Sequence, residues 1–476
     1  ARETATQARR TLECDGDVED VLETLSQHYS STSEPVQFAF AFRTTNELLQ
    51  LLEAVAGDAN HPALQRRSQN SSEQSCLAVL FSGQGGQKVG MAQDIILRRP
   101  DLSWLVRDQK ELLDNCFPPQ RFTVEEKTQD EHDLTRTDRA QRLLAMAQMA
   151  GWMAFSELGA DVSMLAGHSF GEIVALAAGG SMTSRTLYGL AKIRGEAMKN
   201  TGDGGAMTAI RAGADEVSSL LSKNNCTAIS IANINSASQV VVGGPVEQIE
   251  AFERIAVDAQ LNSRRLAVSA AFHTKQMEPS SSELAQRVAD MNITHPTTSV
   301  YRNRVGAPYD RDVDIIEELA SQLRSPVNFE QMVRNMMEDG ANVFVEIGPG
   351  RILSGLVESI TGSECINLDL TSQSDTLPNL AARLLVRGVS LNEGWIRRAM
   401  LPSSTLAPEY HGIVIDGKGV DTRGCVIDGV TRPSHPQVNH VAPLEDSTAP
   451  SHQTALHDAE AQPAQNHAKQ RSSITS

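Results

Sequence analysis

The sequence predicts an α/β protein whose parallel-sheet core is interrupted by a small α+β insert. Two observations predict it. Apolar runs suited to buried strands end in glycine-rich turns within residues 77–87, 162–171 and 343–350, and a helical pattern follows each turn. Between the last two runs, residues 203–268 change to short strands that alternate with two helical patterns. The chain of 476 residues is long enough for several packed units of this kind.

The N-terminal residues 1–75 are expected to form a linker that contains one small βα element. Residues 1–35 are polar and show little periodicity. The segment 35–57 first alternates like a strand and then follows a helical period, with a helix cap at Thr44 or Thr45. A polar connector then leads to an expected strand at residues 77–81.

The remaining boundaries follow from changes in pattern and composition. The core is expected in two pieces, residues 76–202 and 269–370, on either side of the insert at 203–268. Residues 371–400 are expected to form a helix or linker after the core. Residues 401–476 hold seven of the nineteen prolines and six of the twelve histidines, and this polar composition predicts a disordered tail rather than a metal site.

Charge and cysteine usage exclude several classes of function. The net charge of −17 disfavours nucleic acid and anionic membrane surfaces as partners. The six cysteines lack the spacing of a zinc site or a disulfide framework, so no metal is expected and a reducing compartment fits. Without a long apolar run or a secretory signal, a soluble cytoplasmic protein is expected. The first residue, Ala1, indicates processing or a piece of a longer chain.

The segment 167–171 (GHSFG) places a serine between an expected strand and an expected helix. Glycines on both sides of Ser169 permit the strained elbow that holds a nucleophilic hydroxyl outward at a helix N-terminus. The pattern alone also arises by chance, and a structural serine in a tight turn is the alternative. The strand–turn–helix context favours a nucleophile.

A serine hydroxyl needs a base, so a histidine must approach Ser169 from elsewhere in the chain. His168 is its neighbour, and it is expected to pack and to form a hydrogen bond in the turn. Histidines in the polar segments and the tail are poor candidates. His273 is preferred over His295, which lies in a polar segment. From the residues alone, a structural core histidine remains an equal alternative for His273.

A second glycine-rich turn, at residues 83–87 (GQGGQ), follows the first core strand. It lacks the lysine and the spacing of nucleotide-binding loops. Such a turn can offer a backbone N–H that joins the N–H of Phe170 in binding an oxyanion, although a simple structural turn is the alternative. Arg194 lies on the second expected helix after the elbow. It either faces solvent or, if it points inward, suits a carboxylate through its planar fork.

Six motifs in order resemble those of malonyl-CoA:acyl-carrier-protein transacylases and of the acyltransferase domains of polyketide and fatty-acid synthases: FSGQGGQ, GHSFGE, RGEAM, AAFH, VYRNRVGAPY and VEIGPG. The resemblance covers residues 77–370 and implies a hydrolase-like core with a ferredoxin-like insert. Residues 1–75 resemble the linker between a ketosynthase and its acyltransferase. The segment 117–141 resembles the polyunsaturated-fatty-acid-type synthases.

The resemblance also implies site residues. Ser169 is the acylated nucleophile and His273 its base, in a dyad whose imidazole is oriented by a backbone carbonyl. Arg194 binds the free carboxylate of the extender unit. The other implied residues are the oxyanion donors Gln84 and Phe170, the pocket glutamine Gln141, Asn235 of the smaller subdomain, and Phe272, whose bulk crowds an α-methyl group and so predicts malonyl.

Two departures from the family pattern affect these assignments. In the first motif Ser82 and Gly86 replace a proline and a serine, and backbone N–H donation survives both changes. Arg142 follows Gln141 where the family has proline, which alters the setting of that glutamine.

The expected reaction is ping-pong transfer of malonyl from CoA to the phosphopantetheine thiol of an acyl carrier protein. No permanently bound cofactor is expected. The carrier protein and neighbouring synthase domains such as a ketosynthase are the expected partners. Two alternatives stay open: a serine thioester hydrolase on the same scaffold, and a catalytically silent docking domain of a synthase.

Overall fold

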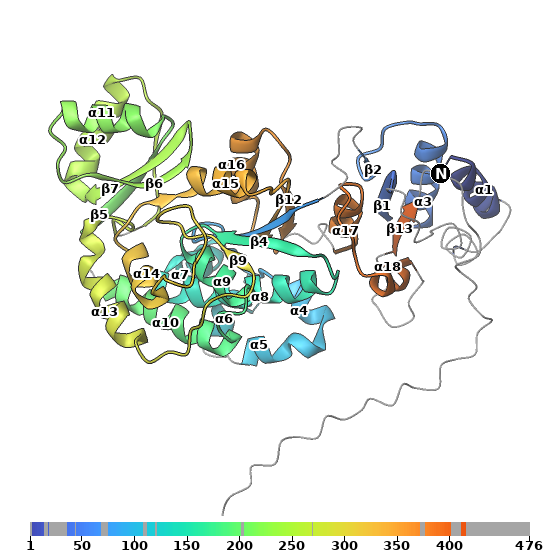
Figure 1. Ribbon diagram of the computed structural model, residues 1–476, viewed down its shortest axis with the longest axis horizontal. Coiled ribbons are helices and arrows are strands. Elements are labelled where there is room, and N and C mark those ends of the chain that lie inside the picture. The colour runs from blue at the N-terminus through green and yellow to red at the C-terminus, as the bar shows by residue number, and fades with distance from the viewer. Residues whose placement is uncertain are drawn as a thin grey trace, which may run out of the picture. The chain divides into compact units, whose positions relative to one another are not determined.

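The computed structural model describes most of the chain before residue 401 and one short segment after it. The described residues are 2–13, 18, 36–42, 44–67, 75–107, 112–119, 121–200, 204–268, 270–371, 377–400 and 411–415. All of them fall within one compact unit. Figure 1 shows the order of the helices and strands along the chain.

The core is a five-stranded sheet in which every neighbouring pair of strands is parallel, as the sequence predicts. Its order is β12-β11-β3-β4-β9. The strands are β3 (Leu77–Phe81), β4 (Val162–Gly167), β9 (Ser299–Val300), β11 (Val343–Gly348) and β12 (Ile366–Asp369). Every residue of β3 and β11 is buried, as expected for parallel strands that are covered on both faces.

Helices cover the two faces of this sheet. Alternate residues of β3 point to opposite sides, so Val79 joins one hydrophobic cluster and Leu80 joins another. The first cluster packs against α8 (Thr137–Ser156), α9 (Phe170–Ala178) and α10 (Ser184–Asn200). The second packs against α15 (Phe329–Glu338) and α16 (Ile352–Thr361).

Shorter helices complete the core. Four α-helices and one turn of 3₁₀ helix precede α8 in the described part of the core: α4 (Gln93–Arg98), η1 (Pro100–Leu102), α5 (Ser103–Arg107), α6 (Leu113–Cys116) and α7 (Val124–Thr135). After the insert come η3 (Lys275–Met277), α13 (Glu278–Val288) and α14 (Ile315–Gln322). The α7 helix starts with a capping box between Thr123 and Glu126.

The insert forms its own sheet and small hydrophobic core. Its elements are β5 (Gly205–Ile210), α11 (Ala214–Lys223), β6 (Ser230–Ser236), β7 (Gln239–Pro245), α12 (Val246–Asp258) and β8 (Ser263–Arg265). The strands pair antiparallel in the order β6-β7-β5-β8. The short strand β10 (Val327–Asn328) of the core adds to this sheet parallel to β6. The ferredoxin-like assignment of the insert stays a prediction.

The expected βα element near the N-terminus is present as β1 (Phe38–Phe42) and α3 (Thr45–Ala56), and the Thr44 hydroxyl caps the helix. The polar N-terminal segment differs from expectation because it forms helix α1 (Arg2–Glu13), which buries Ala5 and Ala8 in the cluster shared with α3. Small alanines suffice here because they allow close helix packing.

The segments after the core also form regular structure. Residues 371–400 contain α17 (Leu377–Leu385) and α18 (Glu393–Met400). The disorder expected for 401–476 is wrong for β13 (His411–Ile415), which pairs antiparallel with β1, while β2 (Gln65–Arg66) pairs with its other edge. The isoleucine and valine in HGIVI suit a strand. The rest of 401–476 lies outside the described residues.

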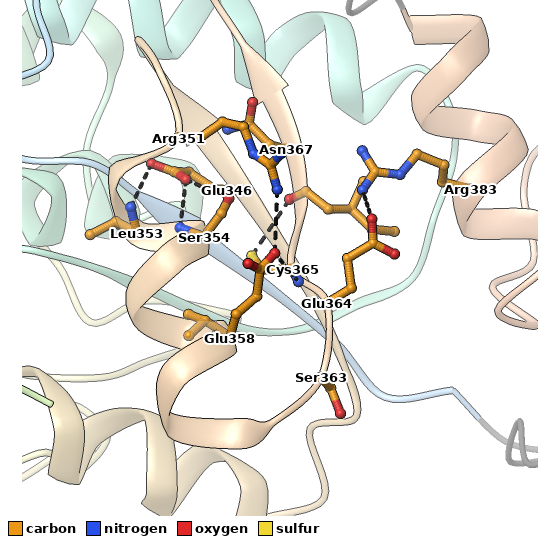
Figure 2. A network of polar contacts seen from close by, with 12 residues as sticks. Glu346, Arg351, Leu353, Ser354, Glu358, Ser363, Glu364, Cys365, Asn367 and Arg383 are labelled. Atoms are coloured by element: carbon orange, nitrogen blue, oxygen red, sulfur yellow. Dashed lines mark hydrogen bonds and ion pairs between the residues drawn. The ribbon is translucent and has the colours of Figure 1, made fainter. Parts of the chain in front are cut away.

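The β11–α16 junction carries a buried glutamate that Figure 2 shows in detail. Glu346, on β11, accepts hydrogen bonds from the N–H groups of Leu353 and Ser354 at 3.0 and 2.8 Å and from the Ser354 hydroxyl at 2.7 Å. The carboxylate thereby satisfies the free N–H groups at the start of α16.

Neither a membrane span nor a metal cluster is present in the described ranges. No helix in them is both long and apolar enough to cross a membrane. No group of three His, Cys, Asp or Glu side chains in the same ranges is arranged to hold a metal ion.

Candidate functional site

Ser169 occupies a strained turn between β4 and α9. Its backbone has φ 53° and ψ −110°, in the region that serine rarely adopts. A Cβ atom on Gly171 would lie 1.9 Å from the Phe81 carbonyl oxygen, and one on Gly167 would lie 2.1 Å from the Gly171 carbonyl carbon. The glycines on either side of Ser169 are therefore required by close backbone packing, which holds the serine in place.

Asn303 holds both sides of this turn. Its Oδ1 accepts the Ser169 backbone N–H at 2.6 Å, and its Nδ2 donates to the Gly167 carbonyl at 2.6 Å. The side chain is fully buried. Two backbone groups that the sharp turn removes from regular pairing are thus satisfied by one amide.

His273 lies within hydrogen-bond distance of the serine hydroxyl. Ser169 Oγ and His273 Nε2 are 2.7 Å apart, and His273 Nδ1 is 2.9 Å from the backbone carbonyl of Gln322. A carbonyl only accepts, so Nδ1 carries the proton and donates it, and Nε2 offers its lone pair to the serine O–H. Burial, and secondarily the charge of Arg194, lowers the pKa of His273 to about 3. The neutral ring is therefore the form present near neutral pH.

The glycine-rich turn after β3 packs directly against the serine turn. The His168 N–H donates to the Phe81 carbonyl at 3.0 Å, and a Cβ on Gly83 would lie 2.6 Å from the His168 carbonyl oxygen. Phe170 is the first residue of α9, so its N–H precedes the intrahelical hydrogen bonds. Gln84 follows Gly83, and its Oε1 accepts from Gln141 Nε2 at 2.8 Å.

Arg194 points inward from α10 and is fully buried. Its Nη2 donates to Gln322 Oε1 at 3.0 Å, whereas Nε and Nη1 have no hydrogen-bond partner in the described part of the chain. Burial lowers the pKa of Arg194 to about 10, and the negative charge of Glu172 opposes this shift. A buried guanidinium with unused donors is costly unless an anion binds it.

His168 and Asn235 connect the serine turn to the insert. His168 Nε2 lies 2.9 Å from Asn235 Oδ1, and Asn235 Nδ2 donates to Gln239 Oε1 at 3.0 Å. The His168 ring also packs on Phe329, with 5.5 Å between ring centroids. His168 thus packs as expected, but its ring forms its hydrogen bond with the insert rather than within the turn.

Phe272 and His295, the two remaining candidates from the sequence, lie in surroundings that differ from each other. Phe272 precedes His273 and is buried in the main hydrophobic cluster of the core. His295, the weaker of the two candidate bases, is exposed. Adjacent turns and direct contacts thus join most of the site residues predicted from the sequence, namely Ser169, His273, Gln84, Phe170, Arg194, Gln141 and Asn235.

Sequence reasoning gave no role to Glu172, Gln322, Tyr309 or Asn303. Glu172 Oε1 accepts from the Tyr309 hydroxyl at 2.5 Å, and its Oε2 accepts from Gln322 Nε2 at 2.6 Å and the Asn303 N–H at 3.0 Å. A single acid in the apolar run EIVALAA was a visible sign of a buried charge. Gln322 carried no comparable signal.

Comparisons with known proteins identify the family of the chain. The family model described as "Acyl transferase domain" matches residues 79–365. The malonyl CoA-acyl carrier protein transacylase of Bacillus subtilis is 30% identical over 292 residues, which cover 60% of this chain and 90% of that protein. The PKS-NRPS hybrid synthetase ATPKS of Aspergillus niger is 28% identical over 384 residues, covering 79% of this chain.

The chain spans only part of its larger relatives. It covers 20% of the length of the Aspergillus synthetase. It also covers 12% of a polyunsaturated fatty acid synthase polypeptide of Thraustochytrium sp., which is 28% identical over 351 residues, or 68% of this chain.

Among solved structures, the acyltransferase domain from the second module of the salinomycin polyketide synthase has the same fold. Its TM-score is 0.66 at 24% identity, over 83% of this chain and 92% of that one. The fold, the arrangement of the motifs and a family match over more than half of the sequence lead to one conclusion. The chain belongs to the acyl transferase domain family.

Proposed function

We propose that this chain transfers a malonyl group from CoA to the phosphopantetheine thiol of an acyl carrier protein through a seryl ester at Ser169. The observation that carries the proposal is one connected group of contacts. Gln322 accepts from the ring of the base His273 through its carbonyl and from Arg194 through its side chain. A nucleophile–base pair is thereby joined to a buried cation with unused donors. The B. subtilis relative is named for the same transfer.

In the first half-reaction, Ser169 Oγ attacks the thioester carbonyl while its proton moves to His273 Nε2. The positive charge that forms on the ring is stabilised by the Gln322 carbonyl, which accepts from Nδ1. The N–H groups of Gln84 and Phe170 bind the oxyanion of the tetrahedral intermediate. When this intermediate collapses, the CoA thiolate leaves and takes the proton from His273.

The second half-reaction repeats these steps in reverse. The carrier thiol gives its proton to His273 as its sulfur attacks the seryl ester. The tetrahedral intermediate then expels Ser169 Oγ, which recovers the proton from His273. The malonyl group leaves as a thioester of the carrier, and the site returns to its starting state without any added cofactor.

Arg194 gives this reaction its selectivity for a diacid. Its free Nε and Nη1 donors suit the distal carboxylate of a malonyl group by charge-assisted hydrogen bonds. Phe272 limits the space beside the α-carbon, Gln141 fixes Gln84, and Asn235 fixes the histidine next to the nucleophile. An acyl carrier protein is the partner, and the βα element before the core suits a neighbouring ketosynthase.

The decisive test is intact-protein mass after incubation with malonyl-CoA. The expected result is a malonyl adduct on the full chain that Ser169→Ala abolishes and that disappears when holo carrier protein is added, with malonyl-carrier appearing. Ser354→Ala is the matched control, because Ser354 also lies on the first turn of a helix that follows a core strand and a glycine turn, but its hydroxyl donates to Glu346. It should retain the adduct.

Two other outcomes would contradict transfer. An adduct that decays to free malonate faster than it passes to the carrier would identify a thioester hydrolase. No adduct on the wild-type chain, with either malonyl-CoA or acetyl-CoA, would identify a silent docking domain.

A further inference from the structure

We propose that Glu172 is a positioning residue that sets the discrimination between carboxylate-bearing and neutral acyl groups, because it fixes the side-chain amide of Gln322 with its oxygen toward Arg194. The proposal rests on the function proposed above, in which Arg194 binds the substrate carboxylate. It adds a residue that touches neither the substrate nor the reacting atoms.

Three hydrogen-bond donors surround the carboxyl group of Glu172. Glu172 lies on the first turn of α9 and is buried. Its three partners, the Tyr309 hydroxyl, Gln322 Nε2 and the Asn303 N–H, all donate to it. Burial raises the pKa of Glu172 to about 7, and these donors oppose the rise.

The surroundings of Gln322 allow only one orientation of its amide. Nε2 lies 2.6 Å from Glu172 Oε2 and 3.1 Å from the Ser169 carbonyl oxygen, and both of these atoms accept. The amide nitrogen must therefore face them. The amide oxygen is left to accept from Arg194 Nη2 at 3.0 Å. A flipped amide would direct its N–H groups at a guanidinium that has only donors.

This orientation decides which part of Arg194 remains for a ligand. Gln322 engages Nη2, while Nε and Nη1 stay without protein partners in the ranges described. No ion pair joins Glu172 and Arg194 among the described residues. The negative charge of Glu172 still favours the charged guanidinium, and its hydrogen bond to Gln322 Nε2 orients the amide between them. The arginine is thereby stabilised in the interior without losing the donors that a substrate carboxylate needs.

Tyr309 holds Glu172 from the opposite side. Its hydroxyl donates to Oε1, whereas Gln322 uses Oε2. Loss of this hydroxyl leaves the charge of Glu172 in place but removes one of its anchors. The effect of Tyr309→Phe should therefore have the same direction as that of Glu172→Gln and be smaller.

The test compares malonyl-CoA with acetyl-CoA in matched variants of the full chain. Glu172→Gln should lower the ratio of kcat/KM for seryl-ester formation, malonyl over acetyl, by about tenfold. Tyr309→Phe should lower it by about threefold. Glu346→Gln removes another buried carboxylate with three donated hydrogen bonds, and Tyr301→Phe removes another buried hydroxyl that donates to a carboxylate, that of Asp339. These two controls should leave the ratio unchanged.

A purely structural role for Glu172 predicts a different result, namely equal losses for both substrates in Glu172→Gln and Tyr309→Phe. That result would overturn the proposal. An unchanged ratio in Tyr309→Phe and Glu172→Gln would do so as well.

A binding measurement separates this inference from the proposed reaction. In a Ser169→Ala background, calorimetric titration with malonyl-CoA and acetyl-CoA needs no acyl transfer. Adding Glu172→Gln to this background should reduce the binding preference for malonyl-CoA over acetyl-CoA by about tenfold. A preference that Glu172→Gln leaves intact would refute the positioning role even if transfer occurs. A reduced preference would support that role even if the seryl ester were hydrolysed rather than transferred.

Discussion

Two strand-to-helix junctions of the same parallel sheet, β4–α9 and β11–α16, each bury a glutamate, and they satisfy it in opposite ways. Glu346 bonds Leu353 and Ser354, seven and eight residues ahead, and so caps the helix that follows its own strand (Figure 2). Glu172 bonds Asn303 and Gln322, 131 and 150 residues away. The first carboxylate stabilises a local turn, whereas the second gathers distant segments around Ser169.

The two junctions also differ in which residue adopts a positive φ. At β11–α16 the positive φ of 81° falls on Gly350, which adopts it without strain. At β4–α9 a positive φ falls on Ser169, the residue whose side chain is needed for chemistry. Of these two junctions, the one that holds the nucleophile is therefore the strained one, and remote contacts such as those of Asn303 maintain its backbone conformation.

The strongest test of this difference adds one methyl group to each junction. Gly171→Ala places a Cβ atom 1.9 Å from the Phe81 carbonyl oxygen, and the backbone must move to avoid it. We expect a loss of about 3 kcal/mol or more in the free energy of unfolding and no seryl adduct. Gly355→Ala, inside α16, meets open space and should stabilise the protein by about 0.5–1 kcal/mol. Urea denaturation and intact mass measure both effects.

An acylated, stable Gly171→Ala variant would show that the serine turn is not held by close backbone packing. A destabilised Gly355→Ala variant would show in turn that the second junction is also tightly constrained.

One arginine near each of the two junctions provides a second, smaller test. Arg383, close to the second junction, pairs with the carboxylate of Glu364 (Figure 2). Glu364 also pairs with Arg387. Arg194 has no such ion pair among the described residues. Arg194→Ala should lower kcat/KM for malonyl-CoA by about 100-fold while sparing acetyl-CoA, since only the diacid loses a charge-assisted contact.

Arg383→Ala serves as the control in the same assay. Because the ion pair is partly exposed, its loss should change the free energy of unfolding by about 1 kcal/mol or less and leave the substrate ratio unchanged. Equal losses for malonyl and acetyl in Arg194→Ala would remove the arginine from substrate recognition.

The two junctions also differ in how far sequence reasoning reached. The strands at 77–81 and 162–167 and the elbow at Ser169 were predictable, because apolar period and glycine spacing are local signals. The local sequence favours His273 over the other histidines, but its role as the base is implied only by the family resemblance, since 104 residues separate it from Ser169. Periodicity does not report which distant side chains meet.

Gln322 and Tyr309 show most clearly which site residues the sequence pattern does not predict. Each is an ordinary polar residue, near the end of a helix or in a loop, and becomes significant only because folding brings it to Glu172. The tail was misjudged for a different reason: β13 is stabilised by pairing with β1, which lies near the opposite end of the sequence. Composition alone predicts disorder for such a segment, because it does not report a distant partner strand.

The smallest expected effect concerns proton binding at the two junctions. The pKa of His273 falls from 6.5 to about 3, so below pH 6.5 the unfolded chain binds the extra proton and stability falls as pH is lowered. The pKa of Glu172 rises from 4.5 to about 7, so its contribution is fully present below pH 4.5 and is lost as pH rises through 7. Between pH 4.5 and 6.5 the two slopes oppose each other. Glu346, whose pKa burial also raises, has no such compensating histidine in its described network.

Single variants should expose the opposed slopes. In Glu172→Gln, the free energy of unfolding should fall as pH is lowered from 6.5 toward 4.5, by at most about 1.4 kcal/mol per pH unit for one proton. In His273→Asn it should instead fall as pH is raised through the same interval. Glu346→Gln should make the free energy of unfolding fall less as pH rises, because the raised pKa of Glu346 acts in that direction alone. Urea midpoints across this interval measure the pH dependence of all three variants. Slopes of equal sign in Glu172→Gln and His273→Asn would contradict the opposed proton binding expected at the β4–α9 junction.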